Sequence, residues 1–224
     1  MKKLILLLFI PLVSFGQSRD SLHQNGERAF NNKEYYKAID YFTEAIKIKG
    51  TDYQSYAKRG RAKSNLNDYY GALEDYDKAL EINPKSENIY VLRADAKKEL
   101  GDFYGSIEDC DKFFEFESDE IGANFLAYSY RAESKTEIQD FYGAISDYTK
   151  TLSYDNHKIT TYWMRGLVKK KLGDKDGACD DLQNAKDAYE KIKETLSEEE
   201  KKGYRFLYVL SEQADICYKY EALL

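Results

Sequence analysis

The chain has 224 residues, of which 34 are basic and 40 are acidic, and its formal charge is −6. An acidic chain without a basic block is poorly suited to nucleic acid or to an anionic membrane surface, so neither partner is expected. Only two prolines are present and no low-complexity stretch occurs, which predicts one continuous body without linkers. The 21 tyrosines and 11 phenylalanines, combined with a mean hydropathy of −0.71, are typical of a thin helical array.

Residues 1–16 have the pattern of a secretory signal peptide. Lys2 and Lys3 precede an apolar run at 4–13, and the sequence Ser-Phe-Gly at 14–16 forms a cleavage site of small residues. The run is shorter than the ~20 apolar residues that span a bilayer, although retention as an anchor is an alternative. Cleavage removes two lysines, which changes the formal charge from −6 to −8. The short, lysine-led form is typical of bacteria and predicts export to the periplasm or the medium, without stable membrane insertion after cleavage.

One five-residue motif occurs five times along the chain. Its copies begin at Glu34, Asp68, Asp102, Asp140 and Asp174. The first four continue with two aromatic residues and end in Ala or Ser, whereas the fifth is degenerate. The second position of the motif recurs after 34, 34, 38 and 34 residues. A fixed period of this length indicates a repeat array.

The residues around this motif resemble the tetratricopeptide repeat (TPR) family over about residues 19–192. The family pattern has a bulky and then a small residue on helix A, followed by an aromatic residue, Ala, an aromatic residue, Ala and Pro. The second copy matches best, through Tyr56, Gly60, Tyr69, Ala72, Tyr76, Ala79 and Pro84. The resemblance implies an all-α fold, a right-handed α-solenoid of five helix pairs plus a C-terminal capping helix. The pairs are expected at 19–52, 53–86, 87–120, 125–158 and 159–192, with the cap at 193–224.

Local signals predict how each helix pair is built. Two short helices cannot bury their apolar faces alone, so each pair must stack on its neighbours. Gly60 and Gly166 stand where helix A must let helix B come close. Asn67, Gly101 and Gly173 are predicted to end helix A. The aspartate that follows each of them is predicted to cap helix B.

Two features lie outside the regular period. Four extra residues, 121–124, precede the fourth repeat, and Phe113 stands nearby where Ala is usual, so one local repacking is expected there. Near the end of the chain, Ser197 and Glu200 form a capping-box pattern and an apolar stripe follows. A terminal helix of this kind is expected to cover the last repeat.

A ladder of opposite charges departs from the family pattern. An arginine recurs on helix A where Leu is usual, and an aspartate recurs on helix B sixteen residues later. Because buried charge has to be paired, a structural ion pair between the two helices is favoured over ligand binding. The expected pairs are Arg59–Asp75, Arg93–Asp109, Arg131–Asp147 and Arg165–Asp181.

No catalytic, metal-binding or cofactor-binding pattern is present in the sequence. His23 and His157 are the only histidines and share no metal-ligand spacing with cysteine or acidic residues. Motifs for a nucleophile elbow, a zinc protease or a phosphate-binding loop are missing. Cys179 and Cys217 are the best disulfide pair in an oxidising compartment, while burial as small hydrophobic residues is the alternative. A non-enzymatic protein without metal or cofactor is therefore expected.

The resemblance implies that the helices A line a concave groove. Family members that grip the acidic tails of chaperones need Lys and Asn one turn apart on the first helix A, but His23 and Glu27 stand there. That ligand is therefore not expected. Trp163, the only tryptophan, is the favoured anchor, with packing against the neighbouring helix A as an equal alternative. The candidate groove residues are Arg61, Asn65, Asp95, Lys98, Glu133, Trp163 and Lys170.

A tyrosine occupies the second position of helix B in four copies of the repeat. Four such rings in register suit contacts with peptides or sugars, although covering the backbone beside Gly71, Gly105 and Gly143 is the favoured explanation. The four residues are Tyr36, Tyr70, Tyr104 and Tyr142.

Together these features predict a non-enzymatic scaffold that binds an unidentified protein or peptide partner in the groove. The alternative is a carrier for a cell-envelope glycan or polymer that uses the four tyrosines. Ligand choice in such scaffolds lies in a few surface residues, so the sequence predicts neither the partner nor the oligomeric state.

Overall fold

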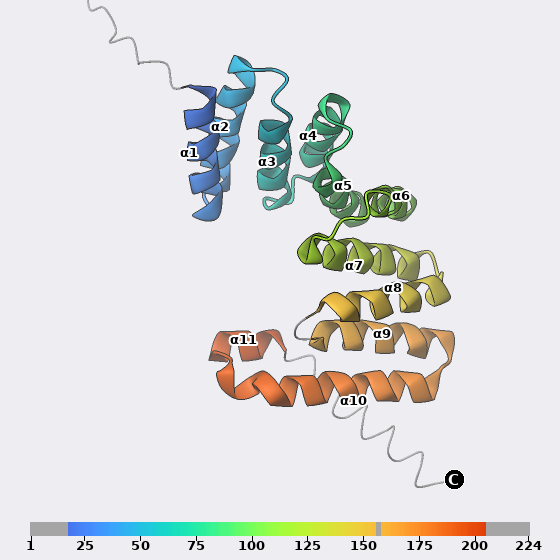
Figure 1. Ribbon diagram of the computed structural model, residues 1–224. Coiled ribbons are helices and arrows are strands. Elements are labelled where there is room, and N and C mark those ends of the chain that lie inside the picture. Colours follow the sequence, from blue (N-terminus) through green and yellow to red (C-terminus); the bar gives the residue numbers. More distant parts are fainter. Residues whose placement is uncertain (1–17, 156–157, 205–224) are drawn as a thin grey trace, which may run out of the picture. The chain divides into compact units, whose positions relative to one another are not determined.

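The computed structural model describes residues 18–155 and 158–204, which form helices joined by short loops (Figure 1). The expected all-α architecture of five helix pairs is confirmed. The pairs are α1 (Arg19–Asn31) with α2 (Tyr35–Ile48), α3 (Tyr53–Ser64) with α4 (Tyr69–Ile82), α5 (Glu87–Glu99) with α6 (Phe103–Phe114), α7 (Ile121–Glu137) with α8 (Phe141–Tyr154), and α9 (Ile159–Leu172) with α10 (Lys175–Ile192). A short 3₁₀ turn (Lys193–Thr195) and α11 (Glu198–Gly203) follow.

The chain divides into two compact units, with the boundary between Lys85 and Ser86. The N-terminal unit contains α1 to α4, and each of its helices packs against the next one along the chain (Figure 1). The C-terminal unit contains α5 to α11, and α5 to α10 follow the same rule. In addition, α5 contacts α7, so the first helices of the third and fourth repeats are neighbours.

The turn between the two helices of each pair uses left-handed backbone. Asn67, Gly101 and Gly173 have φ values of 62°, 82° and 90°, which confirms the predicted stop signals. Lys33 and Gln139 adopt the same conformation at the two other turns, with φ values of 62° and 64°. These two residues have a Cβ that disfavours this conformation, so the turn there is set by the helices it joins.

An aspartate caps helix B in four of the five pairs. Its side chain accepts a hydrogen bond of 2.9–3.0 Å from the backbone N–H of the glycine three residues later. This contact satisfies one of the amide groups that a helix start leaves without an intrahelical partner. The predicted caps are confirmed at Asp68, Asp102 and Asp174, and Asp140 forms the same contact at the start of α8.

Close packing between the helices of a pair depends on small residues of helix A. A Cβ added to Gly26 would lie 2.6 Å from the Phe42 ring, and one added to Gly60 would lie 2.8 Å from the Tyr76 ring. Both rings are almost fully buried. A larger side chain would hold the helices apart, as the sequence predicted.

The four extra residues at 121–124 extend α7 rather than interrupting the array. Ala123 joins Phe113, Val91 and Ala127 in one buried cluster. In the structure, α7 begins at Ile121, four residues before the start that the sequence predicts for the fourth repeat. Four residues add about one helical turn, which keeps the buried face of the helix in register.

The C-terminal end of the described chain folds back on α10. Ser197 and Glu200 form the predicted capping box, with the Ser197 N–H donating to Glu200 Oε2 at 2.8 Å. The Tyr204 ring lies 5.5 Å from the Tyr189 ring, between centroids. The predicted signal peptide, the apolar stripe after residue 204 and Cys217 lie outside the described residues. Within the described residues, none of the helices is long and apolar enough to cross a membrane.

Candidate functional site

Each arginine of the charge ladder makes a two-pronged ion pair with its aspartate. The Nε atom lies 2.8–2.9 Å from Oδ2, and Nη2 lies 2.6 Å from Oδ1, in all four repeats. The aspartate side chains are at most 4% exposed, whereas the arginines retain 14–19%. This bidentate geometry is the strongest form of the contact. It occurs at the predicted spacing in Arg59–Asp75, Arg93–Asp109, Arg131–Asp147 and Arg165–Asp181.

A lysine that the sequence analysis missed joins each of these pairs. It lies one helical turn after the arginine, and its Nζ is 2.7–2.9 Å from the aspartate Oδ2. This lysine recurs with the same period as the arginine, so the sequence repeat could have predicted its role. Each buried carboxylate thus lies between two cations. The lysines are Lys63, Lys97, Lys135 and Lys169.

The remaining arginine nitrogen connects consecutive helix pairs. Arg59 Nη1 donates to Thr43 Oγ1 at 3.1 Å, and Arg165 Nη1 donates to Thr149 Oγ1 at 2.9 Å. Arg131 Nη1 donates to a carboxylate oxygen of Asp111. Since Thr43, Asp111 and Thr149 belong to the preceding helix B, each of these arginines joins three helices. Their donors are engaged inside the protein, which supports a structural role for the ladder.

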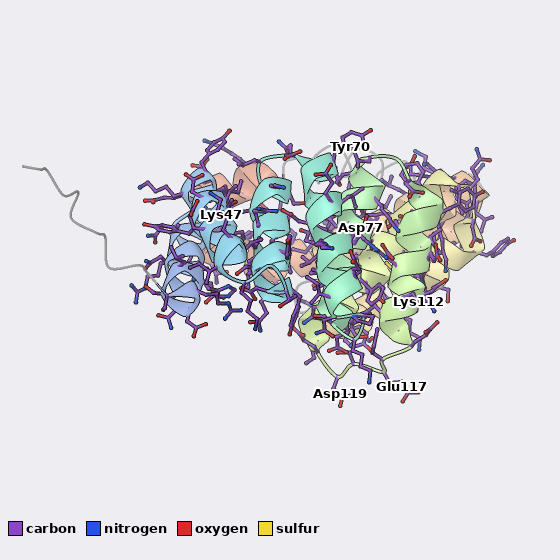
Figure 2. The ribbon with its side chains drawn as sticks, turned by 90° about the horizontal axis from the view of Figure 1, so that it is seen from above. Lys47, Tyr70, Asp77, Lys112, Glu117 and Asp119 are labelled. Carbon is purple, nitrogen blue, oxygen red and sulfur yellow. The ribbon has the colours of Figure 1, made fainter. Side chains whose placement is uncertain are left out.

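The four tyrosines at the second position of helix B are largely exposed. Their exposed fractions are 73–76%. Figure 2 shows the Tyr70 side chain pointing away from the end of α4. This exposure contradicts the favoured interpretation that they cover the backbone beside the glycines. The physical reason is that the aspartate cap already satisfies the glycine N–H, so no ring is needed there. The residues are Tyr36 and Tyr70 in the N-terminal unit and Tyr104 and Tyr142 in the C-terminal unit.

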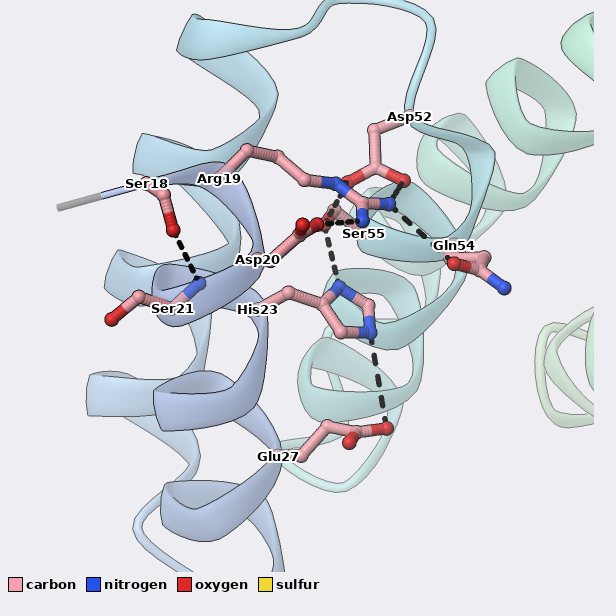
Figure 3. A network of polar contacts seen from close by, with 9 residues as sticks. All are labelled: Ser18, Arg19, Asp20, Ser21, His23, Glu27, Asp52, Gln54 and Ser55. Atoms are coloured by element: carbon pink, nitrogen blue, oxygen red, sulfur yellow. Dashed lines mark hydrogen bonds and ion pairs between the residues drawn. The ribbon is translucent and has the colours of Figure 1, made fainter.

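A polar network occupies the predicted groove positions of the N-terminal unit (Figure 3). Arg19 Nε donates to Asp52 Oδ2 at 2.6 Å, and the Ser55 hydroxyl donates to the same oxygen at 2.5 Å. His23 Nδ1 lies 2.8 Å from Ser55 Oγ, and its Nε2 lies 3.8 Å from Glu27 Oε1. Because the Ser55 proton is used on Asp52, Nδ1 is the donor to Ser55. The network connects α1 to the start of α3.

This network has structural rather than catalytic chemistry. Ser55 is fully buried, so its hydroxyl cannot reach a substrate. Burial lowers the pKa of His23 below its usual value, although Glu27 opposes this shift. Burial raises the pKa of Asp52, but hydrogen bonds from Arg19 and Ser55 outweigh it and the net pKa is lowered. The two groups therefore stay in the neutral and ionised forms, respectively, near pH 7.

The other groove residues of the N-terminal unit are used within the unit. The Arg61 guanidinium lies 5.0 Å from the centre of the Phe30 ring. Asn65 Nδ2 donates to the Arg61 carbonyl at 2.8 Å, which satisfies a carbonyl at the end of α3. Glu27 pairs with Lys58 at 2.9 Å.

Trp163 packs into the C-terminal cluster of the chain. It lies partly buried against a cluster that contains Ile159, Leu182 and Tyr189. This placement favours packing over a role as an exposed anchor. Lys170, the other residue predicted at this end of the groove, is exposed.

The remaining three groove residues lie close together in the C-terminal unit. Lys98 Nζ lies 2.8 Å from Glu133 Oε2 and 3.4 Å from Asp95 Oδ1. It also lies 3.0 Å from Oε1 of Glu99, a residue that was not among the predicted groove residues. Glu133 is on α7 and the other three are on α5. The Lys98 ammonium also lies 4.8 Å from the centre of the Tyr130 ring. One cation is thus shared by three carboxylates.

A pocket of about 250 Å³ opens beside this cluster. We call it the acidic pocket, because three carboxylates and one ammonium are among its lining groups. Its residues come from α5 (Lys98, Glu99), α6 (Phe103), α7 (Glu133, Thr136, Glu137), α8 (Tyr148) and α9 (Met164). Only Lys98 and Glu133 were predicted. Glu99, Thr136 and Glu137 lie on the same two helices, and Phe103, Tyr148 and Met164 come from helices whose stacking the sequence does not show.

The acidic pocket has a buried hydroxyl that is not hydrogen bonded. Tyr148 is 2% exposed, and its hydroxyl has no hydrogen-bond partner within the described part of the chain. The nearby Thr136 hydroxyl donates instead to the Ala132 carbonyl at 2.8 Å. Burial, together with the charges of Glu133 and Glu137, raises the pKa of Tyr148 above its usual value, although the nearby Thr136 hydroxyl and the Lys98 charge oppose this shift. Native proteins rarely leave such a group unsatisfied, so hydrogen bonding is incomplete at this point of the pocket wall.

The second helix pair matches a known repeat family. Residues 53–86, which contain α3 and α4, match the tetratricopeptide repeat family. The same packing of consecutive helices recurs in the other four pairs. The chain therefore contains a tetratricopeptide repeat and has the fold of a tetratricopeptide repeat array.

Solved structures with a similar fold include other TPR proteins. MamA has a TM-score of 0.69 and 18% sequence identity, with 80% of this chain and 96% of that chain covered. MamA 41-end from Desulfovibrio magneticus RS-1 has a TM-score of 0.71 and 15% identity, with 77% and 96% of the two chains covered. YrrB, described as a TPR protein with an unusual peptide-binding site, has a TM-score of 0.63 and 14% identity, with 77% and 87% of the two chains covered. A comparison with curated proteins found no match. At these identities the likeness shows the fold alone.

The acidic pocket brings together predicted groove residues, a cavity and an unsatisfied polar atom. Over residues 18–155 and 158–204, no group of three or more histidine, cysteine or acidic side chains is arranged to hold a metal ion. We therefore take the acidic pocket as the candidate binding site.

Proposed function

We propose that this protein is an exported, non-enzymatic scaffold that binds a peptide or protein partner through the acidic pocket and the adjoining groove face of the C-terminal unit. The observation that carries the proposal is the pocket itself, which is lined by five helices and contains the unsatisfied Tyr148 hydroxyl. A cavity with a few convergent polar groups is the usual form of a binding site.

The fold supports a protein partner in general. TPR arrays expose a long surface that is built from consecutive helices A, and this geometry is suited to extended partners. YrrB, which shares the fold, is described as having a peptide-binding site. In this chain, the first helices of the third, fourth and fifth repeats line the pocket together with α6 and α8, so the pocket adjoins the surface along which an extended segment would run.

A second function is favoured by a different observation. The four tyrosines at the start of helix B are about three-quarters exposed, and exposed aromatic rings suit stacking on sugar rings. A carrier for a cell-envelope glycan that uses these rings is therefore the alternative. It differs from the leading proposal in the surface used, so separate variants test the two.

The test is capture from a bacterial envelope extract with residues 17–224 as bait. Thr136→Trp places a large side chain in the pocket without changing its charge, and Ser146→Trp adds the same side chain to an exposed position of α8 as a matched control. The proposal expects one polypeptide to be captured by the parent chain and by Ser146→Trp, but not by Thr136→Trp. Equal capture by both variants would refute it. Circular dichroism checks that each variant is folded.

The alternative predicts a different pattern of capture. Polysaccharide rather than polypeptide would be retained, and replacing the exposed tyrosines by serine would abolish the retention while Thr136→Trp would not affect it. The replaced residues are Tyr36, Tyr70, Tyr104 and Tyr142.

A further inference from the structure

We infer that the acidic pocket receives a basic side chain, lysine or arginine, from an extended segment of the partner. The inference rests on the proposed function and specifies the chemistry that the partner must present. It is carried by the charge balance of the pocket and the apolar residues among its lining.

The charge of the pocket is negative after all internal pairing is counted. Lys98 is the only cation among the lining residues, and it faces Glu133 at 2.8 Å and Glu99 at 3.0 Å. Glu137, one turn after Glu133 on α7, forms no ion pair with any described residue. Asp95, just outside the pocket, also faces Lys98, at 3.4 Å. The site therefore attracts a cation.

Lys98 is not available to bind an anionic ligand. Its side chain is 14% exposed and lies over the Tyr130 ring. Burial alone would lower the pKa of Lys98, but the hydrogen bond to Glu133 and the charges around it hold that pKa above its usual range. Burial likewise raises the pKa of Asp95, and the neighbouring carboxylates add to this shift. An incoming anion would meet these carboxylates before it reached the ammonium.

The uncharged part of the pocket fits the stem of a long side chain. Phe103 and Met164 contribute apolar surface, on which the methylene groups of lysine or arginine can pack. Glu133 and Glu137 supply carboxylates for the charge, and Tyr148 forms part of the pocket wall. A volume of about 250 Å³ is just below the range of about 300–1,000 Å³ typical of small-molecule pockets, so a single side chain is the better match.

Met164 provides a direct reporter for this inference. It is the only methionine in residues 17–224, so a ¹³C label on its methyl group gives one signal from the lining of the pocket. The probe is the capped pentapeptide acetyl-Gly-Ser-Arg-Ser-Gly-amide. Its twin carries citrulline, which has nearly the shape of arginine but no charge. Titration of each peptide into residues 17–224 yields the two dissociation constants.

The expected result is at least tenfold tighter binding of the arginine peptide than of the citrulline peptide. Glu133→Gln combined with Glu137→Gln should remove this difference, whereas Glu115→Gln, at an exposed position just after α6, should leave it intact. Lys98→Met should strengthen binding of the arginine peptide severalfold because it removes the competing cation. Equal affinity for the two peptides, or weaker binding by a folded Lys98→Met variant, would overturn the inference.

The two experiments distinguish failure of this inference from failure of the proposed function. If Thr136→Trp abolishes capture of the partner but arginine and citrulline peptides bind equally, the scaffold proposal stands and the basic side chain is excluded. If the arginine preference is found but Thr136→Trp still captures the partner, the pocket has the inferred chemistry and the partner binds elsewhere.

Discussion

Replacing Asp147 by asparagine is expected to destabilise the C-terminal unit more than replacing either of the cations that it binds. The Asp147 carboxylate accepts hydrogen bonds from Arg131 at 2.9 and 2.6 Å and from Lys135 at 2.7 Å. Its side chain is 4% exposed. Asp147→Asn keeps the shape of the side chain but leaves the half-buried Lys135 without its carboxylate and Arg131 with only the exposed carboxylate of Asp111.

The magnitude follows from the burial of the carboxylate and from how many of its hydrogen bonds each substitution removes. Removing one partner of a buried ion pair costs about 3–5 kcal/mol. Because Arg131 and Lys135 retain 17% and 18% exposure, water compensates part of this cost, and we expect about 3 kcal/mol for Asp147→Asn. Arg131→Met keeps the stem and leaves Lys135 on the carboxylate, so about 2 kcal/mol is expected. Lys135→Met removes a single hydrogen bond and should cost about 1 kcal/mol.

The measurement is equilibrium urea denaturation of residues 17–224, followed by far-UV circular dichroism and analysed by linear extrapolation. A double-mutant cycle between Arg131→Met and Asp147→Asn should give a coupling free energy of about 1.5 kcal/mol. The matched control is Lys112→Met, which removes an exposed ion pair with Glu115 and should cost at most about 0.5 kcal/mol.

The order of the three effects tests the reasoning. If Asp147→Asn costs no more than Lys135→Met, or if the coupling free energy is close to zero, then the carboxylate does not hold the two cations. In that case, the ion pairs of the ladder would contribute little to the free energy of unfolding.

Three further predictions concern packing and pH. Gly60→Ala should lower the free energy of unfolding by about 1–3 kcal/mol, because the new methyl group meets the Tyr76 ring. As a control, Gly122→Ala places its methyl group where no atom lies within 4 Å, and it should be neutral or stabilising. Equal effects of the two substitutions in urea denaturation would contradict the close-approach explanation. Because burial lowers the pKa of His23, the unfolded chain binds its proton first, so stability should fall as the pH drops below about 6.5; His23→Asn should flatten this part of the stability profile, and an unchanged slope would exclude His23 as the cause. Trp163→Ala should lower the melting temperature, with about 2–3 kcal/mol lost from the C-terminal cluster, and should leave partner capture intact once the protein is folded; loss of capture by a folded variant would restore Trp163 as an anchor.

The sequence by itself determined the helix pairs and the contacts within them. Stop signals such as Asn67 and Gly101, caps such as Asp68, and the arginine–aspartate spacing of sixteen residues all act between close neighbours along the chain. Their geometry follows from helix and turn stereochemistry, and it recurs with the 34-residue period. The number of pairs and the partners of the ladder were for this reason predictable from residue positions alone.

Only the tertiary structure decided where the packed helix pairs leave a cavity and a polar group without a hydrogen-bond partner. The acidic pocket combines Glu133 with Tyr148 and Met164 from two further helices, and no local rule relates these positions. The extra turn at the start of α7 and the packing of Trp163 also depend on how neighbouring pairs stack. Stacking is a sum of many weak, non-local contacts, so a repeat period predicts that the helices meet but not which side chains converge at each junction.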